Sequence, residues 1–287
     1  MGEILVDKFL SFEMKKALDR RGFVRNLGLA GAALAGTGLL SACGGSSSGS
    51  SMMTAQAATL DNTSGDSAQQ VFTAALIAED LASTFYFNGV SAGAITSALQ
   101  ADDIAYLKAA LNEEIDHANL LRAQLNIAAS TSDPVQMFLF PTGTFSSLTT
   151  FLSVLDALEN AFIGAYLAAV KEFAQMAVDT KGGTSQMSAA GAVYTTPQLE
   201  YFAEVSASIM GVECEHRVLG REIASLLPNN ECFEMQDSIT TVFNGTTSAA
   251  AALGPFITAG DTSLQTALTG AAALIGTGTC TGTVPAS

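Results

Sequence analysis

Four long stretches of the chain repeat apolar residues every three or four positions, which is the spacing of one face of an α-helix. They cover about residues 67–88, 102–128, 144–179 and 196–227 and are separated by stretches rich in Gly, Pro, Ser and Thr. Asp102 and Asp103 suit the first turn of a helix, and Thr196 predicts an N-cap followed by Pro197 at the first helical position. The content of Ala and Leu favours helices over strands. The pattern therefore predicts an all-α protein.

A carboxylate interrupts the apolar face of each predicted helix. These carboxylates are Glu79, Glu114, Glu159 and Glu213. In the second and fourth helices a histidine follows three residues later, His117 and His216, and these are the two histidines of the chain. Residues three apart share a helix face, so each histidine lies beside its glutamate.

The first two predicted helices match the last two position by position. Glu79 and Glu159 are each followed seven residues later by a tyrosine, Tyr86 and Tyr166. Each histidine is followed five residues later by an arginine, Arg122 or Arg221. The repetition predicts two helical hairpins related by a pseudo-twofold axis.

Four buried carboxylates repel one another and cannot stay ionised without compensation. Two divalent cations would balance them, and the mixed carboxylate and imidazole donors suit Fe, Mn or Zn better than Mg or Ca. One Glu from each of two helices, with Glu-x-x-His from each of the other two, is the ligand set of dimetal-carboxylate four-helix bundles. The sequence therefore predicts a dimetal site.

The chain resembles the ferritin-like domain family of exported bacterial proteins, to which plant desiccation-related proteins are related. The resemblance is carried by the segments ALIAEDLASTFYFNGV, LKAALNEEIDHANLLRAQL, FLSVLDALENAFIGAYLAAV and ASIMGVECEHRVLGREI. It implies an up-down four-helix bundle over residues 67–228, followed by a C-terminal extension, residues 229–287. It also implies metal ligation by Glu79, Glu114, His117, Glu159, Glu213 and His216, with Glu114 and Glu213 as bridges. Iron is the expected metal, and manganese is the second choice.

Two classes of function fit this site. The first is a dimetal oxidoreductase that reacts with O2 or peroxide, either oxidising Fe(II) or removing peroxide. The second is a stress-protective or envelope-binding protein whose metals only stabilise the fold. A closed iron-storage cage is less expected, whereas a homodimer is compatible with the pattern.

Several other residues have two interpretations. Tyr86 and Tyr166 could belong to the core, as most aromatic residues at helical spacing do, or could donate to the ligands and relay electrons. Glu113 could orient a ligating histidine, but its position favours solvent exposure. Asp80, Asp116 and Glu215 fall outside the apolar faces and are predicted to be solvated. Arg122 and Arg221 are expected to play the same structural role in the two hairpins.

The N-terminal region predicts export. Residues 20–25, RRGFVR, resemble a twin-arginine motif and precede a short apolar run that is too short to span a membrane. The run ends in Leu40-Ser41-Ala42-Cys43, which resembles a lipobox with Cys43 as the lipidated residue. Residues 1–42 would then be a signal and residues 43–66 a Gly/Ser-rich tether. We expect a periplasmic or cell-envelope lipoprotein that is held on the membrane by its lipid, with no other spanning segment.

The charge of the chain excludes one class of partner. The formal net charge is −15, and without residues 1–42 six basic and 23 acidic residues remain, a net charge of −17. A protein that binds nucleic acid needs a basic surface for the phosphates. We therefore expect no nucleic-acid partner.

The remaining cysteines lie in or after the fourth predicted helix. An exported protein can form disulfides, and Cys232 and Cys280 are predicted to pair. Cys214 lies between two predicted ligands and is expected to be a buried free thiol, with metal ligation as the alternative. Weak helical patterns over residues 247–258 and 263–275 predict that the extension packs on the bundle.

Overall fold

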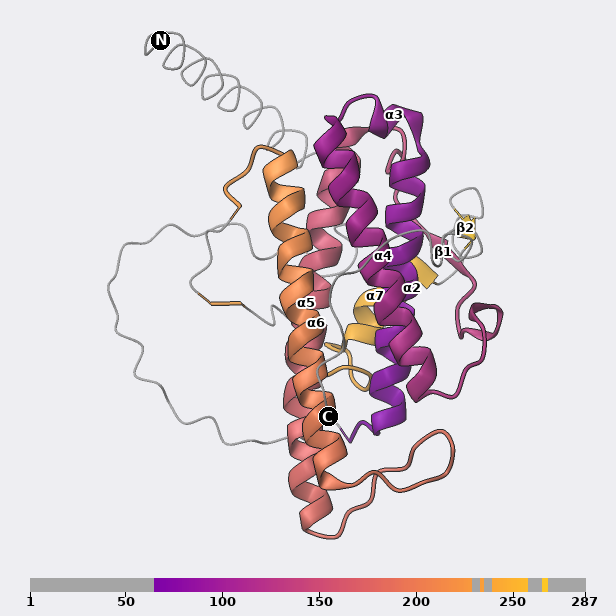
Figure 1. The fold of residues 1–287 in the computed structure, drawn as a ribbon, viewed down its shortest axis with the longest axis vertical. Helices are drawn as coiled ribbons and strands as arrows, with labels where there is room; N and C mark the ends of the chain where they lie inside the picture. Colours follow the sequence, from indigo (N-terminus) through magenta and orange to yellow (C-terminus); the bar gives the residue numbers. More distant parts are fainter. Residues whose placement is uncertain (1–64, 229–232, 235–238, 258–264, 268–287) are drawn as a thin grey trace, which may run out of the picture.

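The computed structural model describes residues 65–228, 233–234, 239–257 and 265–267 of the 287-residue chain (Figure 1). Its helices are α2 (Ala68–Ser91), α3 (Gly93–Thr96), α4 (Ala101–Gln124), α5 (Leu148–Lys181), α6 (Thr196–Ile223) and α7 (Ala249–Ile257). A 3-10 turn, η1 (Ser130–Ser132), and two short strands, β1 (Met137–Leu139) and β2 (Gln265–Ala267), complete the described elements. The predicted signal, lipidated Cys43 and the Cys232–Cys280 disulfide lie outside the described residues.

The four long helices begin where local hydrogen bonds can satisfy their free N–H groups. The side chain of Ser67 caps α2, and Gln70 bonds back to the Ser67 backbone in a capping box. Asp102 and Asp103 lie in the first turn of α4, as predicted. The N-cap of α6 is Thr195 rather than Thr196, so Pro197 occupies the second helical position. The shift of one residue follows from the capping box between Thr195 and Gln198.

The long helices form a bundle of two antiparallel hairpins, α2–α4 and α5–α6 (Figure 1). Contacts between Tyr86 and Glu159, and between Tyr166 and Glu79, show that α2 and α5 are also antiparallel. Consequently α4 and α5 run in the same direction, and the connection of residues 125–147 returns along the bundle. This topology gives the two hairpins the predicted pseudo-twofold relation and confirms the helical-bundle fold.

The region after the bundle adds one helix and one strand. Helix α7 contacts α2 and α5, and β2 pairs with β1 in antiparallel register, Met137 opposite Ala267. The prediction of a helix over residues 263–275 is therefore wrong at residues 265–267, where pairing with β1 overrides local propensity. Asp66 ties this region to the start of α2, because its carboxylate accepts hydrogen bonds from the backbone N–H groups of Phe243 and Asn244.

The core consists of two apolar clusters, one on each side of a polar layer in the middle of the bundle. One cluster contains Phe72, Phe173 and Phe202. The other contains Phe85 and Phe151. Among the described helices, α5 alone is long and apolar enough by composition to cross a membrane, but most of its apolar stretch is buried against the other helices. The polar layer between the clusters contains the predicted metal ligands.

Candidate metal centre

All six predicted ligands meet in the polar layer at the middle of the bundle. Glu79 comes from α2, Glu159 from α5, and α4 and α6 each supply a glutamate and a histidine. Every carboxylate is buried, and the side chain of His216 is 3% exposed against 13% for His117. Their ligand atoms form two overlapping groups, each of which fits within 4.8 Å. The groups are Glu79, Glu114, His117 and Glu213, and Glu114, Glu159, Glu213 and His216.

The first group surrounds the Nδ1 atom of His117. Its distances are 3.4 Å to Glu79 Oε2, 3.5 Å to Glu114 Oε2 and 3.5 Å to Glu213 Oε1. These donor atoms lie close enough together for one metal ion to be held by three carboxylates and one imidazole. We call these four residues the His117 half of the centre.

The second group surrounds the Nδ1 atom of His216. Its distances are 3.1 Å to Glu114 Oε1, 3.4 Å to Glu213 Oε2 and 4.0 Å to Glu159 Oε1. Glu114 and Glu213 therefore each direct one oxygen to His117 and the other to His216. This is the geometry of two bridging carboxylates with one terminal glutamate and one histidine on each side. We call this group the His216 half.

The donor atoms fit a pair of metal ions because few of them have another partner. Eight buried side-chain atoms of these residues make no hydrogen bond: one oxygen each of Glu79 and Glu159, both oxygens of Glu114 and Glu213, and both histidine Nδ1 atoms. A buried polar atom without a partner costs about 1–3 kcal/mol, and more when it is charged. Two divalent ions would satisfy these atoms and balance the four carboxylates.

Burial and mutual repulsion perturb the site in the absence of cations. Burial raises the pKa of Glu114 and raises that of Glu159 well above its ordinary value. Burial alone would lower the pKa of both histidines, but the surrounding carboxylates raise them well above the usual value. Protons on the imidazoles and carboxylates therefore compensate negative charge that metal ions would otherwise balance. Metal binding should release these protons.

The two tyrosines connect the hairpins through the terminal glutamates. The Tyr86 hydroxyl on α2 donates to Glu159 on α5, and the Tyr166 hydroxyl on α5 donates to Glu79 on α2. Burial, followed by the nearby carboxylates, raises the pKa of both phenols well above the ordinary value. Both hydroxyls therefore stay protonated and act as donors, so the tyrosines are core residues and partners of the ligands. The repeated spacing of seven residues was the available signal, but it did not show that the contacts cross between helices.

Glu113 contacts a ligand of the centre while its side chain stays 36% exposed, so both interpretations hold in part. Its carboxylate lies 2.8 Å from Nε2 of His216, and this hydrogen bond lowers the pKa of Glu113. When His216 is neutral, an ionised Glu113 that accepts from Nε2–H leaves the lone pair of Nδ1 available to a metal ion. The corresponding residue of the other hairpin is Val212, which cannot accept a hydrogen bond. The His216 half therefore has a carboxylate that can orient its histidine, and the residue at the corresponding position of the other hairpin offers none.

Replacing Glu113 by Gln should weaken metal binding at the His216 half about 10–100-fold, the usual effect of removing a carboxylate behind a ligating histidine. Calorimetric titration of the metal-free chain with Mn(II) measures this effect. Asp116→Asn is the matched control, because Asp116 is an exposed acid on the same helix. Equal affinities for the two variants would contradict the positioning role of Glu113.

Asp80 is buried, contrary to the prediction that it is solvated. Its carboxylate lies 2.6 Å from Nη2 of Arg122, and the same guanidinium holds Asp133 of the α4–α5 connection. Burial raises the pKa of Asp80 to about 8. A largely protonated Asp80 therefore reduces the negative charge that Arg122 has to balance in this cluster. Asp133 lies in the connection after α4, so the periodic pattern of the helices could not indicate it as a partner of Arg122.

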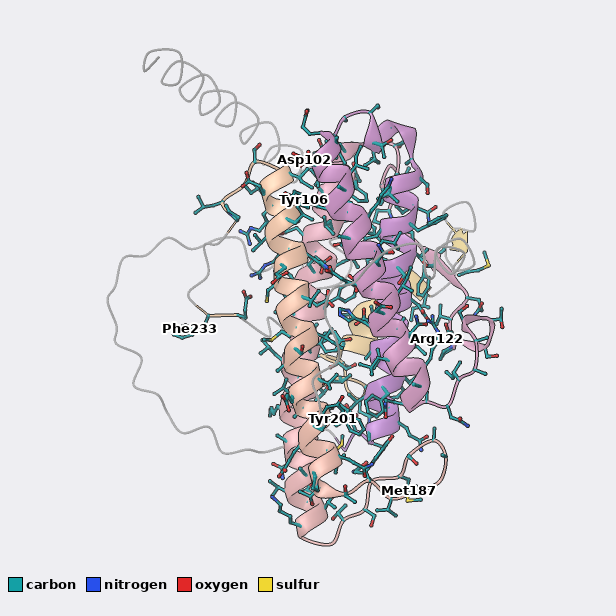
Figure 2. All side chains as sticks on the ribbon, in the orientation of Figure 1. Asp102, Tyr106, Arg122, Met187, Tyr201 and Phe233 are labelled. Atoms are coloured by element: carbon teal, nitrogen blue, oxygen red, sulfur yellow. The ribbon has the colours of Figure 1, made fainter. Side chains whose placement is uncertain are left out.

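The two arginines that were expected to play equivalent roles do not. Arg221 donates from Nε to the backbone oxygen of Leu227 near the surface, while a different arginine, Arg217, binds Asn160 and Glu234. Asp116 and Glu215 are exposed, as predicted. Figure 2 labels Arg122 on the side of the bundle where the connection that it holds runs.

Cys214 is a free thiol of intermediate exposure. It belongs to neither group of candidate ligands. Burial raises its pKa to about 11, so the thiol stays protonated and is a poor metal ligand at neutral pH. The expectation of a free thiol is confirmed, although the side chain is only partly buried.

The comparison with protein families agrees with this geometry. The ferritin-like domain family matches residues 67–225, which is more than half of the chain and includes all six candidate ligands. No curated protein and no solved structure matches the chain. The helical bundle, its buried carboxylate and histidine cluster and the family match together show that the chain belongs to the ferritin-like domain family.

Proposed function

We propose that this protein is a dimetal-carboxylate oxidoreductase that reacts with O2 or peroxide, either by oxidising Fe(II) or by removing peroxide. The observation that carries the proposal is the bridging arrangement of Glu114 and Glu213, each with one oxygen towards each histidine. Mixed nitrogen and oxygen donors favour Fe or Mn over Mg or Ca. Such ions, when bound, supply redox chemistry and open coordination positions for an oxygen species.

The residues of the chain hold and tune this centre. Glu79 and Glu159 would each be a terminal ligand, and Tyr166 and Tyr86 fix one oxygen of each by donating to it. Glu113 fixes the tautomer and orientation of His216. Because the phenols are buried beside the carboxylates, they are also the nearest side chains that could relay an electron or a proton.

We also propose that the protein acts outside the cytoplasm as a lipoprotein. The support is the twin-arginine and lipobox pattern of residues 20–43, with the lipid on Cys43. A protein exported in the folded state could acquire its metals before crossing the membrane. Protection of the cell envelope against oxidative stress is the role that this location and chemistry suggest.

Turnover by the loaded chain tests the oxidoreductase. We expect the wild-type chain to oxidise added Fe(II) under air, or to consume peroxide, faster than buffer, measured by Fe(III) absorbance and with an oxygen electrode. Glu114→Ala should reduce the rate to that of buffer, because it removes a bridge, and Asp116→Ala should not change it. Two bound ions without turnover above buffer would overturn the oxidoreductase in favour of a purely structural metal pair.

A further inference from the structure

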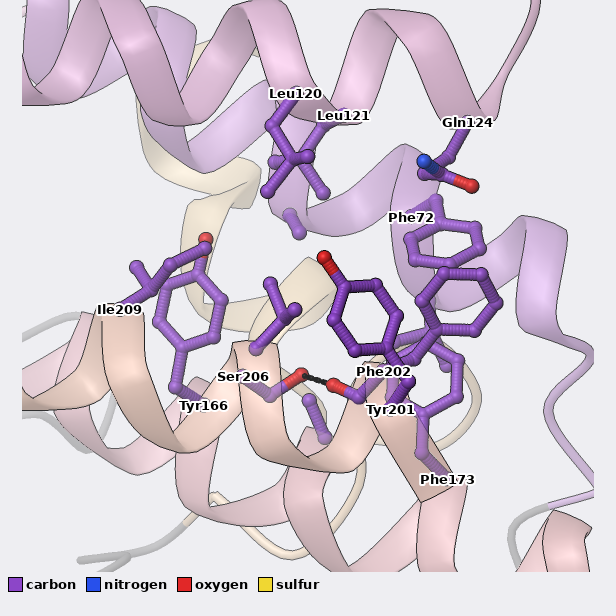
Figure 3. A pocket seen from close by; sticks show the side chains of 14 residues that line it. Phe72, Leu120, Leu121, Gln124, Tyr166, Phe173, Tyr201, Phe202, Ser206 and Ile209 are labelled. Atoms are coloured by element: carbon purple, nitrogen blue, oxygen red, sulfur yellow. Dashed lines mark hydrogen bonds between the residues drawn. The ribbon is translucent and has the colours of Figure 1, made fainter. Parts of the chain in front are cut away.

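An apolar pocket lies between α4 and α6 at the His117 half of the centre (Figure 3). Its space for a water-sized molecule is about 20 Å³, and the pocket is partly open to solvent. Leu120 and Leu121 approach it from α4, while Tyr201, Ser206 and Ile209 face them from α6. The pocket is therefore placed where the two hairpins meet.

The pocket lies one helical turn from three ligands of the His117 half. Ala75, Leu121 and Ile209 line it, and each is four residues from a ligand on the same helix and face. Those ligands are Glu79, His117 and Glu213, respectively. Tyr166 also lines the pocket while its hydroxyl donates to Glu79. A molecule in the pocket would therefore be adjacent to this half of the centre.

The lining suits an apolar molecule and not an ion. No charged side chain lines the pocket. The Ser206 hydroxyl donates to the backbone oxygen of Phe202 (dashed line in Figure 3), and the Tyr166 hydroxyl is occupied by Glu79. A hydrated Fe(II) ion would lose most of its hydrogen bonds with water, because the Tyr201 hydroxyl and the Gln124 amide are the remaining polar side-chain groups of the lining. Apolar cavities stay free of water and can take up xenon.

The pseudo-twofold partner of this region is filled. The residues that correspond to Ala75 and Leu121 are Leu155 and Gly220, and a Cβ atom at Gly220 would come within 2.7 Å of Leu155. Next to them, the ring of Phe151 packs against Gly89 and stacks on Phe85 with centroids 4.5 Å apart. The His216 half is thus closed by close packing, whereas the His117 half faces a hollow.

We propose that this pocket binds a small, uncharged apolar reactant of the size of dioxygen and presents it to the His117 half. Binding of the reactant does not depend on the proposed function. Its reaction at the His117 half rests on the proposed function, because that reaction requires the dimetal oxidoreductase. It assigns different tasks to the two halves: the His216 half, held by Glu113, retains its ion, and the His117 half receives the reactant.

Methyl NMR of the metal-free full-length chain, under xenon pressure and then with benzene, tests binding without any metal. We expect shifts at the methyl groups of Leu121, Val205 and Ile209, and none at Leu152 or Leu155 on the closed side. We expect shifts with xenon and none with benzene, because the cavity has space for little more than one small molecule. Shifts with benzene would contradict a site of dioxygen size. No shift with either probe, or equal shifts on both sides, would overturn the proposal.

Substitutions that fill the pocket with a larger side chain provide a second test of the proposal. Val205→Phe should abolish the xenon shifts of Leu121 and Ile209, with Leu120→Phe as the alternative if that variant does not fold. Val218→Phe is the matched control, because Val218 lies on the same helix, is 37% exposed and does not line the pocket. After loading, the filled variant should bind as much metal as the wild type but consume O2 more slowly. Xenon shifts that persist in the filled variants would overturn the assigned location of the pocket. A wild-type chain that binds no metal after loading would contradict the dimetal centre and not the pocket.

Discussion

Replacing Glu114 by Ala is expected to abolish binding of both metal ions, whereas replacing Glu159 by Ala should remove only one. Glu114 directs one oxygen to each histidine, at 3.5 Å from His117 and 3.1 Å from His216, so both ions depend on it. Glu159 approaches His216 alone. We therefore expect about two metal ions per wild-type chain, about one for Glu159→Ala and none for Glu114→Ala.

Elemental analysis of the full-length chain after anaerobic loading with Fe(II) or Mn(II), followed by removal of free metal, measures these stoichiometries. Loss of metal should not reflect unfolding, because Glu114→Ala removes one of four mutually repelling buried carboxylates from the metal-free bundle. Circular dichroism should therefore show unchanged helix content and a melting temperature no lower than that of the metal-free wild type.

The matched control for Glu114→Ala is Asp116→Ala, an exposed acid on the same helix that should keep both ions. Equal metal content in Glu114→Ala and Glu159→Ala would contradict the bridging geometry. A wild-type chain that takes up no transition metal would contradict the dimetal centre as a whole.

Arg122→Leu is expected to destabilise the bundle by about 3–5 kcal/mol, the usual cost of removing one partner of a buried ion pair. Arg122 is buried and holds Asp80 of α2 and Asp133 of the α4–α5 connection through contacts of 2.6 Å. Its removal leaves two buried carboxyl groups, those of Asp80 and Asp133, without the guanidinium that binds them. The connection that returns the chain from α4 to α5 should loosen at the same time.

Urea denaturation of the metal-free chain at neutral pH measures this loss. Arg221→Leu is the matched control, since it removes the sequence-equivalent arginine of the other hairpin and breaks one hydrogen bond near the surface. Asp80→Asn should change stability little, because Asp80, with its pKa raised to about 8 by burial, is already protonated at neutral pH. A similar loss of stability for Arg122→Leu and Arg221→Leu would show that the buried triad contributes little.

The helices and the candidate ligands were predictable because both depend on local periodicity. A glutamate that interrupts an apolar helix face must lie in the core if the rest of that face does, and a histidine three residues later lies beside it. Four such interruptions, arranged as a repeat, were enough to predict the bundle and six convergent side chains. The pairing of β1 with β2 was not predictable, because the two strands lie about 130 residues apart in the sequence.

Residues whose role depends on a partner from another helix were assigned less well. Glu113 and Asp80 are acids beside predicted ligands, and sequence alone could not distinguish solvent exposure from contact with His216 or Arg122. The crossed bonds of Tyr86 and Tyr166 required the antiparallel packing of α2 on α5.

The sequence by itself determined the helical architecture and the composition of the centre, because helical spacing fixes which residues share a face. Only the tertiary structure decided how the two halves of that centre differ. Two nearly symmetric hairpins place Glu113 opposite His216 and Val212 in the corresponding position, and they pack Leu155 against Gly220 while leaving a hollow beside Leu121. These differences arise from the sizes and charges of side chains that meet across helices, which no pattern along one helix contains.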